Sequence, residues 1–252
     1  IDAGQAEPVG LDLGSGARPL GQALLKQHGL TQPQTCHVFM SHLHWDHIMG
    51  FPFFGPAYIA GNRIVIHACH EQLEAAFRRQ QDHPSFPVAL EQMAADIEFD
   101  VLQPGHHYSI AGLDVYAIRQ RHPGDSYGWR FEHQGRSVVY STDSEHRIES
   151  APERGTFVDF FAGADLVIFD AMYSLADAIT VKQDWGHSSN LYGVDLCLAA
   201  RVRQLVLFHH EPAHDDALID RILTETRRYE EISRSGHRLE VISAWDGLEL
   251  TV

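Results

Sequence analysis

The chain alternates short apolar runs of strand length with longer segments whose apolar residues recur at helical spacing. The clearest helical segment covers residues 217–233, where Leu218, Ile222 and Tyr229 would lie on one face. The pattern predicts strands over residues 38–40, 64–68, 97–102, 107–110, 113–120, 127–133, 137–141, 166–170 and 205–209. It predicts helices over residues 47–54, 71–81, 88–95, 190–200 and 217–233. Because consecutive strands and βα units follow one another without a linker, we expect one α/β domain over residues 1–252, with a helical insertion around residues 71–95.

Composition narrows the class of protein. The 252 residues are 44% hydrophobic, which is enough for a sizeable core. No apolar run reaches the roughly 18 to 20 residues that span a bilayer, and the sequence opens with no recognisable secretory signal. The cysteines, Cys36, Cys69 and Cys197, are odd in number and form no CxxC pair. We therefore expect a cytoplasmic protein without disulfides, and no membrane partner.

The net charge bears on which partners the protein could bind. Asp plus Glu number 34 against 19 Lys plus Arg, which gives a formal net charge of −15. An acidic surface repels the phosphate backbone, so the charge argues against a nucleic-acid polymer as a partner. The 18 histidines are more informative, because several of them fall in clusters at the ends of predicted strands.

The densest cluster is the HxHxDH segment formed by His42, His44, Asp46 and His47, directly after the apolar run 38–40. Loops at strand ends are where a scaffold presents chemistry, and imidazole with carboxylate suits Zn, Mn or Fe better than Ca or Mg. The alternative, a histidine-rich turn without a metal, rarely produces this spacing by chance. Further candidate ligands end later strands, and these are His122, Asp143 and His209.

These motifs resemble those of the metallo-β-lactamase superfamily, for which HxHxDH is a signature. Residues 10–16 look like its early strand and DxG turn, and residues 121–143 look like motifs of its ribonuclease Z and phosphodiesterase branch. Asp170, the GHSS segment 186–189 and residues 207–209 resemble further elements of that branch. The resemblance implies a four-layer αβ/βα sandwich of two mixed β-sheets flanked by helices.

The resemblance also implies a ligand set for two divalent ions, with zinc expected first and manganese or iron as alternatives. One ion would be held by His42, His44 and His122, and the other by Asp46, His47 and His209. Asp143 would bridge the two ions, and His210 is the competing choice for the last ligand. His187 would be the catalytic acid with Asp170 orienting it, and Asp46 would serve catalysis as well as metal binding.

Two such ions can lower the pKa of a bridging water toward neutrality, and the resulting hydroxide can attack phosphorus or a carbonyl carbon. A small phosphodiester or cyclic nucleotide is the expected substrate. The transfer-RNA processing enzymes of the branch that this chain resembles bind RNA with a basic, Gly-rich arm, and the stretch between Asp143 and Asp170 carries none. The alternatives are hydrolysis of an ester, lactone or thioester, an RNA-processing endonuclease, and a metal-binding module without catalysis. His44 argues against the diiron branch, which has Glu at that position. The resemblance makes a homodimer plausible.

Overall fold

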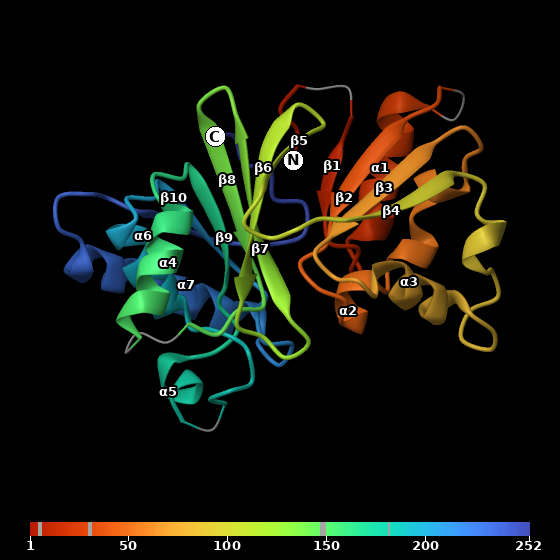
Figure 1. The fold of residues 1–252 in the computed structure, drawn as a ribbon. Coiled ribbons are helices and arrows are strands. Elements are labelled where there is room, and N and C mark those ends of the chain that lie inside the picture. The colour runs from red at the N-terminus through yellow and green to blue at the C-terminus, as the bar shows by residue number, and fades with distance from the viewer. Residues whose placement is uncertain (5–6, 30–31, 147–149, 181) are drawn as a thin grey trace. The chain divides into compact units, whose positions relative to one another are not determined.

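The computed structural model describes residues 1–4, 7–29, 32–146, 150–180 and 182–252. The chain divides into two compact units, Ile1–Gly112 and Leu113–Val252, each with its own strands and helices (Figure 1). The expected α/β class, with two sheets and flanking helices, is confirmed. Each unit is described by itself below.

The first unit is built on a four-stranded sheet of order β1-β2-β3-β4 in which adjacent strands are parallel. The strands are β1 (Val9–Leu11), β2 (Thr35–Phe39), β3 (Arg63–Ala68) and β4 (Asp96–Val101). The helices are α1 (Ala17–His28), α2 (Trp45–Ile48) and α3 (Leu73–Gln81), with single 3-10 turns at Phe51–Phe53, Gly55–Tyr58 and Leu90–Gln92. A short strand, β5 (His107–Ile110), ends the unit.

The core of this unit follows from strand alternation. Side chains two residues apart on a strand share a face, and Cys36, Val38 and Met40 on or beside β2 are all buried in the same cluster. Ile64 and Ile66 of β3 join them. The cluster also takes in Phe51 and Phe77, whose rings pack edge to face with centroids 5.1 Å apart. The packed face therefore fixes where β2 ends and where the HxHxDH segment begins.

The alternate positions of β2 and β3 carry a chain of polar groups. His37 Nδ1 lies 2.9 Å from His67 Nε2, and His67 Nδ1 lies 2.9 Å from Asp100 Oδ2. Glu7 Oε2 lies 3.1 Å from the other ring nitrogen of His37. Burial lowers the pKa of His67 to about 4, so this imidazole is neutral at pH 7. The ring nitrogens of both histidines therefore have hydrogen-bond partners within the first unit.

The second unit carries a mixed sheet whose strands follow the order β11-β10-β9-β8-β7-β6. β6 to β8 pair antiparallel, and β8 to β11 pair parallel. Its strands are β6 (Leu113–Gln120), β7 (Ser126–His133), β8 (Arg136–Ser141), β9 (Leu166–Asp170), β10 (Gln204–Phe208) and β11 (Glu240–Ser243). Its helices are α4 (Ala151–Phe161), α5 (Leu175–Ala178), α6 (Asn190–Ala199) and α7 (Asp216–Ser233).

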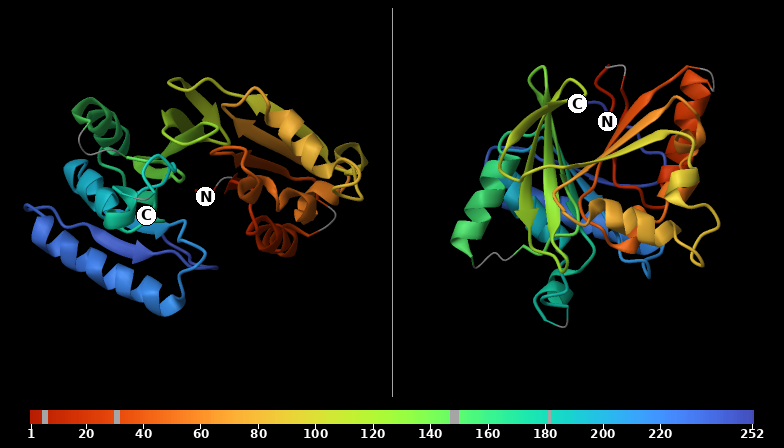
Figure 2. Two further views of the ribbon diagram at one scale, coloured as in Figure 1. Left: turned by 90° about the horizontal axis from the view of Figure 1, so that it is seen from below. Right: turned by 45° about the vertical axis from the view of Figure 1, so that its right-hand side comes forward.

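Helices α4 and α6 cover a core made largely by β9 and β10. Val167 and Phe169 of β9 and Leu205 and Leu207 of β10 are fully buried there. Gly193 of α6 allows the closest approach, because a Cβ at this position would lie 2.7 Å from the Phe169 ring. Helix α7 runs beside α6 and β11 (Figure 2). This packing brings the carboxyl ends of β8, β9 and β10 to one edge of the sheet.

The structure departs from the predicted elements in a few places. The expected helix over residues 47–54 breaks after α2, because the Gly50 N–H donates to the Leu13 carbonyl (2.7 Å) and Pro52 has no N–H to continue the helix. Residues 88–95 form only the 3-10 turn Leu90–Gln92. Helix α1 and strand β11 were not predicted from the apolar pattern. None of the described helices is long and apolar enough to span a membrane.

His146 gives the second unit a pH-dependent stability. Its ring stacks on Phe169 and packs edge-on against Phe157, and burial lowers its pKa to about 3. The unfolded chain binds the proton below about pH 6.5, whereas the folded chain does not. The stabilisation is therefore complete above pH 6.5 and is lost as the pH falls toward 3, by roughly 1.4 kcal/mol per pH unit.

When the pH falls from 6.5 to 5, the unfolding free energy should drop by about 2 kcal/mol less in His146→Phe than in wild type. Urea unfolding at both pH values measures this difference. His106→Phe is the matched control, because His106 is exposed and its replacement should leave the pH dependence unchanged. If wild type and His146→Phe lost the same free energy on acidification, the burial of a neutral His146 would not explain the acid sensitivity.

Candidate metal centre

The HxHxDH segment of the first unit begins where β2 ends, and Asp12 holds it in place by hydrogen bonds. Asp12 follows β1 in a left-handed conformation (φ 53°) and is buried. Its Oδ1 accepts a hydrogen bond from the backbone N–H of Ser41 (2.6 Å). Its Oδ2 accepts from Ser41 Oγ (2.7 Å) and lies 2.8 Å from His47 Nδ1. A carboxylate placed this way fixes the loop and one of its imidazoles together.

The hydrogen bonds of Asp12 also set which nitrogen of each ring carries the proton. His47 donates through Nδ1 to the carboxylate, which makes Nε2 its basic nitrogen. Ser41 gives its hydroxyl proton to Asp12, so Ser41 Oγ accepts from His42 Nδ1 at 3.0 Å. The basic nitrogen of His42 is then Nε2 as well. Both buried rings therefore turn the ligand-type nitrogen away from Asp12.

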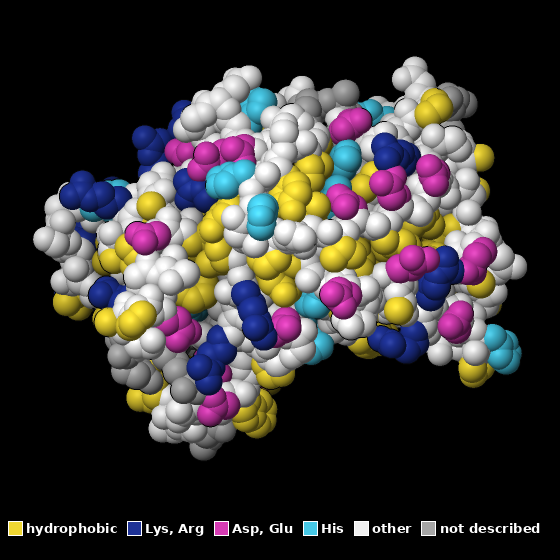
Figure 3. Space-filling model, viewed as in Figure 1, with side chains coloured by type: hydrophobic (Ala, Val, Ile, Leu, Met, Phe, Trp, Pro, Cys, Tyr) yellow, Lys and Arg dark blue, Asp and Glu magenta, His cyan; other side chains and the backbone are white. Residues whose placement is uncertain are grey.

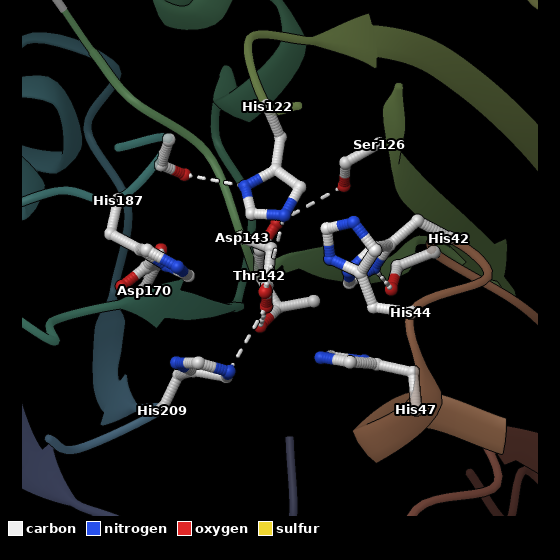
Figure 4. Close-up of polar contacts among 12 residues, drawn as sticks. His42, His44, His47, His122, Ser126, Thr142, Asp143, Asp170, His187 and His209 are labelled. Carbon is white, nitrogen blue, oxygen red and sulfur yellow. Dashed lines mark hydrogen bonds and ion pairs between the residues drawn. The ribbon is translucent and has the colours of Figure 1, made fainter. Parts of the chain in front are cut away.

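The basic nitrogens of this loop converge. His42 Nε2 lies 3.0 Å from His44 Nδ1, and the His42 and His47 ring centroids are 4.1 Å apart (Figure 4). His47 Nε2 lies 3.4 Å from Asp46 Oδ2. Imidazole nitrogens and a carboxylate at such separations match the donor set of zinc and related ions. The side chains of this loop therefore fit a divalent cation chemically.

The second unit brings its own donors together at the carboxyl ends of its strands. Asp143, just beyond β8, is 2% exposed and has a left-handed backbone (φ 43°). Its Oδ1 accepts from Thr142 Oγ1 at 2.7 Å and lies 3.4 Å from His209 Nε2. Its Oδ2 lies 3.8 Å from His122 Nε2. The two carboxylate oxygens thus face different histidines, as a bridging ligand would.

His122 is oriented by the backbone of the GHSS segment. Its Nδ1 donates to the Gly186 carbonyl oxygen at 2.8 Å, which leaves Nε2 as the basic nitrogen on the side of Asp143. Gly186 has φ +88°, and a Cβ here would lie 2.4 Å from His122 Nδ1. Only glycine fits this position, so the segment's first residue is fixed by the need to hold His122.

His187 and Asp170 form a pair at the same sheet edge. Asp170, at the end of β9, is fully buried and accepts from the backbone N–H groups of Met172 (3.0 Å) and Ser144 (3.2 Å). His187 Nδ1 lies 2.8 Å from Asp170 Oδ2. The Asp170 carboxylate therefore holds the imidazole with Nε2 directed away from it.

The ring of His187 lies among the other donors of this unit (Figure 4). It stacks on His209 and meets His122 edge-on, each with centroids 5.0 Å apart. Donor atoms of His122, Asp143 and His187 lie within 4.8 Å of one another, as do those of Asp170, His187 and His209. These groups could hold a metal ion, or His187 could act beside one.

The structure separates the two adjacent candidates for the last ligand. His209 Nε2 faces Asp143, whereas His210 Nε2 lies 3.1 Å from Ser243 Oγ. Burial is the main cause that lowers the pKa of His210. Asp215, a little further along the chain, caps α7 by accepting from the Leu218 N–H at 2.8 Å. Of these two histidines, His209 is therefore the one that faces Asp143.

Asp12, Ser41 and the Gly186 carbonyl are the contributors that sequence reasoning missed. Residues 10–16 were recognised only as a turn, yet Asp12 of that turn positions two histidines that lie about 30 residues later. In the sequence, the signal for this role of Asp12 is an Asp that directly follows a short strand. The GHSS segment also caps a helix, because Ser189 Oγ accepts from the Leu191 N–H at the start of α6 while His187 pairs with Asp170.

Comparison with known proteins identifies a matching protein family and similar proteins. The family model for the β-lactamase superfamily domain matches residues 10–210. A protein of Acaryochloris marina named ribonuclease Z is 24% identical over 77% of this chain and 74% of its own length. A ribonuclease Z of Oceanobacillus iheyensis is 20% identical over 76% of each chain.

Solved structures share the fold. The metallo-β-lactamase fold protein YhfI from Bacillus subtilis has a TM-score of 0.65 at 20% identity, covering 94% of this chain and 84% of its own. The short form of human tRNase Z has a TM-score of 0.61 at 19% identity, covering 94% and 85%. Yeast PDE1 has a TM-score of 0.60 at 17% identity, covering 84% and 67%.

The relatives correct one expectation and establish the family. Net charge argued against a nucleic-acid polymer as partner, but the curated relatives are named ribonuclease Z, so that argument is wrong. The net charge of −15 is a sum over the whole chain and does not describe any one region. On the face shown in Figure 3, Lys and Arg are interspersed with Asp and Glu. Binding depends on the local potential and on bound cations. By its matched domain and its fold, this chain belongs to the metallo-β-lactamase superfamily of hydrolases.

Proposed function

We propose that this protein is a metal-dependent phosphodiesterase and that the phosphodiester bonds of RNA are its substrate class. The observation that carries the proposal is the pair formed by buried Asp170 and His187, which lies beside Asp143 and His209 in the second unit. It joins a candidate acid to candidate metal ligands at one sheet edge. The relatives named ribonuclease Z support RNA as the substrate class.

Two divalent ions, zinc first and manganese or iron as alternatives, would be held by the donors predicted from the sequence. We propose that His42, His44 and His122 hold one ion and that Asp46, His47 and His209 hold the other. Asp143 would bridge them. The tautomers set by Asp12 and by the Gly186 carbonyl support this assignment, because His42, His47 and His122 each present Nε2 as the basic nitrogen.

Ions of this kind would supply an activated water and stabilise negative charge on the phosphoryl oxygens. The protein's own task is then to orient its donors and to provide the leaving oxygen with a proton. His187 is placed for that task, since Asp170 binds Nδ1 and the other nitrogen, Nε2, is left for the substrate. The leaving group would take the proton from Nε2.

Removing the metal should abolish the activity reversibly. Treatment with a chelator followed by gel filtration should lower phosphodiesterase activity at least a hundredfold, because no Ser or Cys nucleophile is part of the proposed chemistry. Adding back Zn²⁺ or Mn²⁺ in measured amounts should restore it, with about two equivalents at saturation. Full activity in protein shown to be metal-free by elemental analysis would contradict the metal-dependent mechanism.

Replacing the acid should slow turnover without releasing metal. We expect His187→Ala to lower kcat by about 10²- to 10⁴-fold, the usual contribution of a positioned general acid. Asp170→Asn should lower it less, because the amide can still contact the ring. His210→Ala is the control, since His210 contacts Ser243 rather than Asp143.

The measurements are steady-state kinetics together with metal content for each variant. Loss of metal in His187→Ala would reassign His187 to the ligands, and unchanged kcat with metal retained would remove it from catalysis. A loss of activity in His210→Ala as large as that in His187→Ala would contradict the placement of His209 as the last ligand.

The substrate class can be tested with a panel on metal-loaded protein. We expect chelator-sensitive cleavage of an RNA oligonucleotide, a tRNA transcript and bis(p-nitrophenyl) phosphate, with little action on p-nitrophenyl acetate or a thioester. A cyclic nucleotide tests the finer prediction of a small phosphodiester. Cleavage of the ester or thioester without cleavage of any phosphodiester would contradict the proposal and indicate a carbonyl hydrolase.

A further inference from the structure

A groove of about 550 Å³ opens in the first unit immediately beside the HxHxDH segment. Its floor is formed by the buried side chains of Ile48, Pro52 and Ala76. Its walls come from α2 and the turns that follow it on one side, and from α3 and the loop after it on the other. The described residues that line it are Leu43, Trp45, Ile48, Met49, Pro52, Phe53, Ala76, Arg79, Gln80, Ser85 and Phe86.

Two large aromatic side chains of this groove face solvent. Trp45 is 68% exposed and Phe53 is 55% exposed, although both lie next to a well-packed core. Phe86, from the loop after α3, meets the Phe53 ring edge-on with centroids 5.6 Å apart. Gln80 Nε2 donates to the Ile48 carbonyl at 3.1 Å and ties α3 to the other wall. The Phe53 ring thus contacts an aromatic side chain of the opposite wall, and α3 is hydrogen-bonded to α2, the helix that carries Trp45.

The charge of the groove differs from that of the chain. Among the described residues that line it, Arg79 is the charged one, and no carboxylate is included. Arg79 is exposed and has no ion pair with any residue in the described part of the chain, whereas its neighbour Arg78 pairs with both Glu74 and Glu91. In a chain of net charge −15, a groove with an uncompensated guanidinium is complementary to an anion.

We propose that this groove binds a nucleotide of the substrate next to the bond that is cut, with a base stacked on Trp45 or Phe53 and a phosphate bound by Arg79. Exposed aromatic faces beside an arginine are the combination that binds single-stranded nucleic acid. Trp45 lies between His44 and Asp46 in the sequence, so a base held there would be adjacent to the proposed metal ligands. This inference rests on the proposed phosphodiesterase function and names the part of the substrate that this unit recognises.

The first arm of the test measures binding without turnover. The probe is a fluorescein-labelled hexauridylate with phosphorothioate linkages, titrated into metal-loaded protein and followed by anisotropy at several salt concentrations. We expect Phe53→Ala to weaken binding about tenfold with an unchanged salt dependence. Arg79→Ala should also weaken binding and should lower the slope of log K against log salt by about 0.7, the value for one lost contact to a single strand. Arg78→Ala is the matched control and should bind as wild type does.

The second arm compares two substrates that differ by a nucleoside. Thymidine 5′-(p-nitrophenyl phosphate) carries a base, and methyl p-nitrophenyl phosphate does not. Phe53→Ala should raise KM for the nucleoside ester about tenfold while kcat stays within about twofold, and it should leave methyl p-nitrophenyl phosphate unaffected. Arg79→Ala should leave KM for both esters unchanged, because each ester carries only the phosphate that is cut. Unfolding midpoints of all variants show whether the fold is retained.

The two arms separate this inference from the proposed function. If wild type cleaves both esters but all variants bind the hexauridylate equally, the nucleotide site is wrong while the phosphodiesterase stands, and the groove belongs to another occupant such as an apolar protein segment. If wild type cleaves neither ester, the proposed function fails, and selective loss of hexauridylate binding in Phe53→Ala and Arg79→Ala still decides for the nucleotide site.

Discussion

Asp12 and Asp170 are buried carboxylates, and the geometry of the two His-rich regions depends on the hydrogen bonds that they accept. Asp12 binds the N–H and hydroxyl of Ser41 and the ring of His47. Asp170 binds backbone N–H groups and the ring of His187. A buried carboxylate is tolerated when such donors replace its lost hydration. The same donors then become fixed in position. The hydrogen bonds that compensate for burial of the carboxylate therefore also orient the histidine, and both are met by one requirement.

This requirement explains details of the chain that otherwise look unrelated. The Asp12 turn has to approach the loop after β2 closely, and Gly14 allows this because a Cβ there would lie 2.6 Å from the Asp46 carbonyl. Gly186 plays the same part for His122 in the second unit. Each glycine lets the backbone reach an imidazole or the segment that carries one. The donor nitrogens are consequently fixed by the protein before any ion binds, which reduces the cost of ordering a metal site.

The sequence predicted the class of fold and the candidate residues for physical reasons that can be named. Strand periodicity located β6 and β9 to the residue, and the HxHxDH spacing identified a metal-type donor set. Helix α1 was not predicted because its first turns contain Pro19 and Gly21, which are poor helix formers. Residues 88–95 form only a turn although their apolar pattern suggested a helix. Contacts between segments far apart in the chain, such as that of Asp12 with His47, could not be predicted from spacing. Net charge misled the choice of partner, since it carries no information on where the charges lie.

The central proposal is that the seven donors inferred from the sequence hold two divalent ions. Crystals of zinc-loaded protein, with diffraction data collected on both sides of the zinc absorption edge, test it most directly. The account predicts two anomalous peaks, one bound by His42, His44 and His122 and the other by Asp46, His47 and His209, with Asp143 contacting both. Peaks that contact the histidines of one unit alone, or a single peak bound by His187 and Asp170, would contradict it.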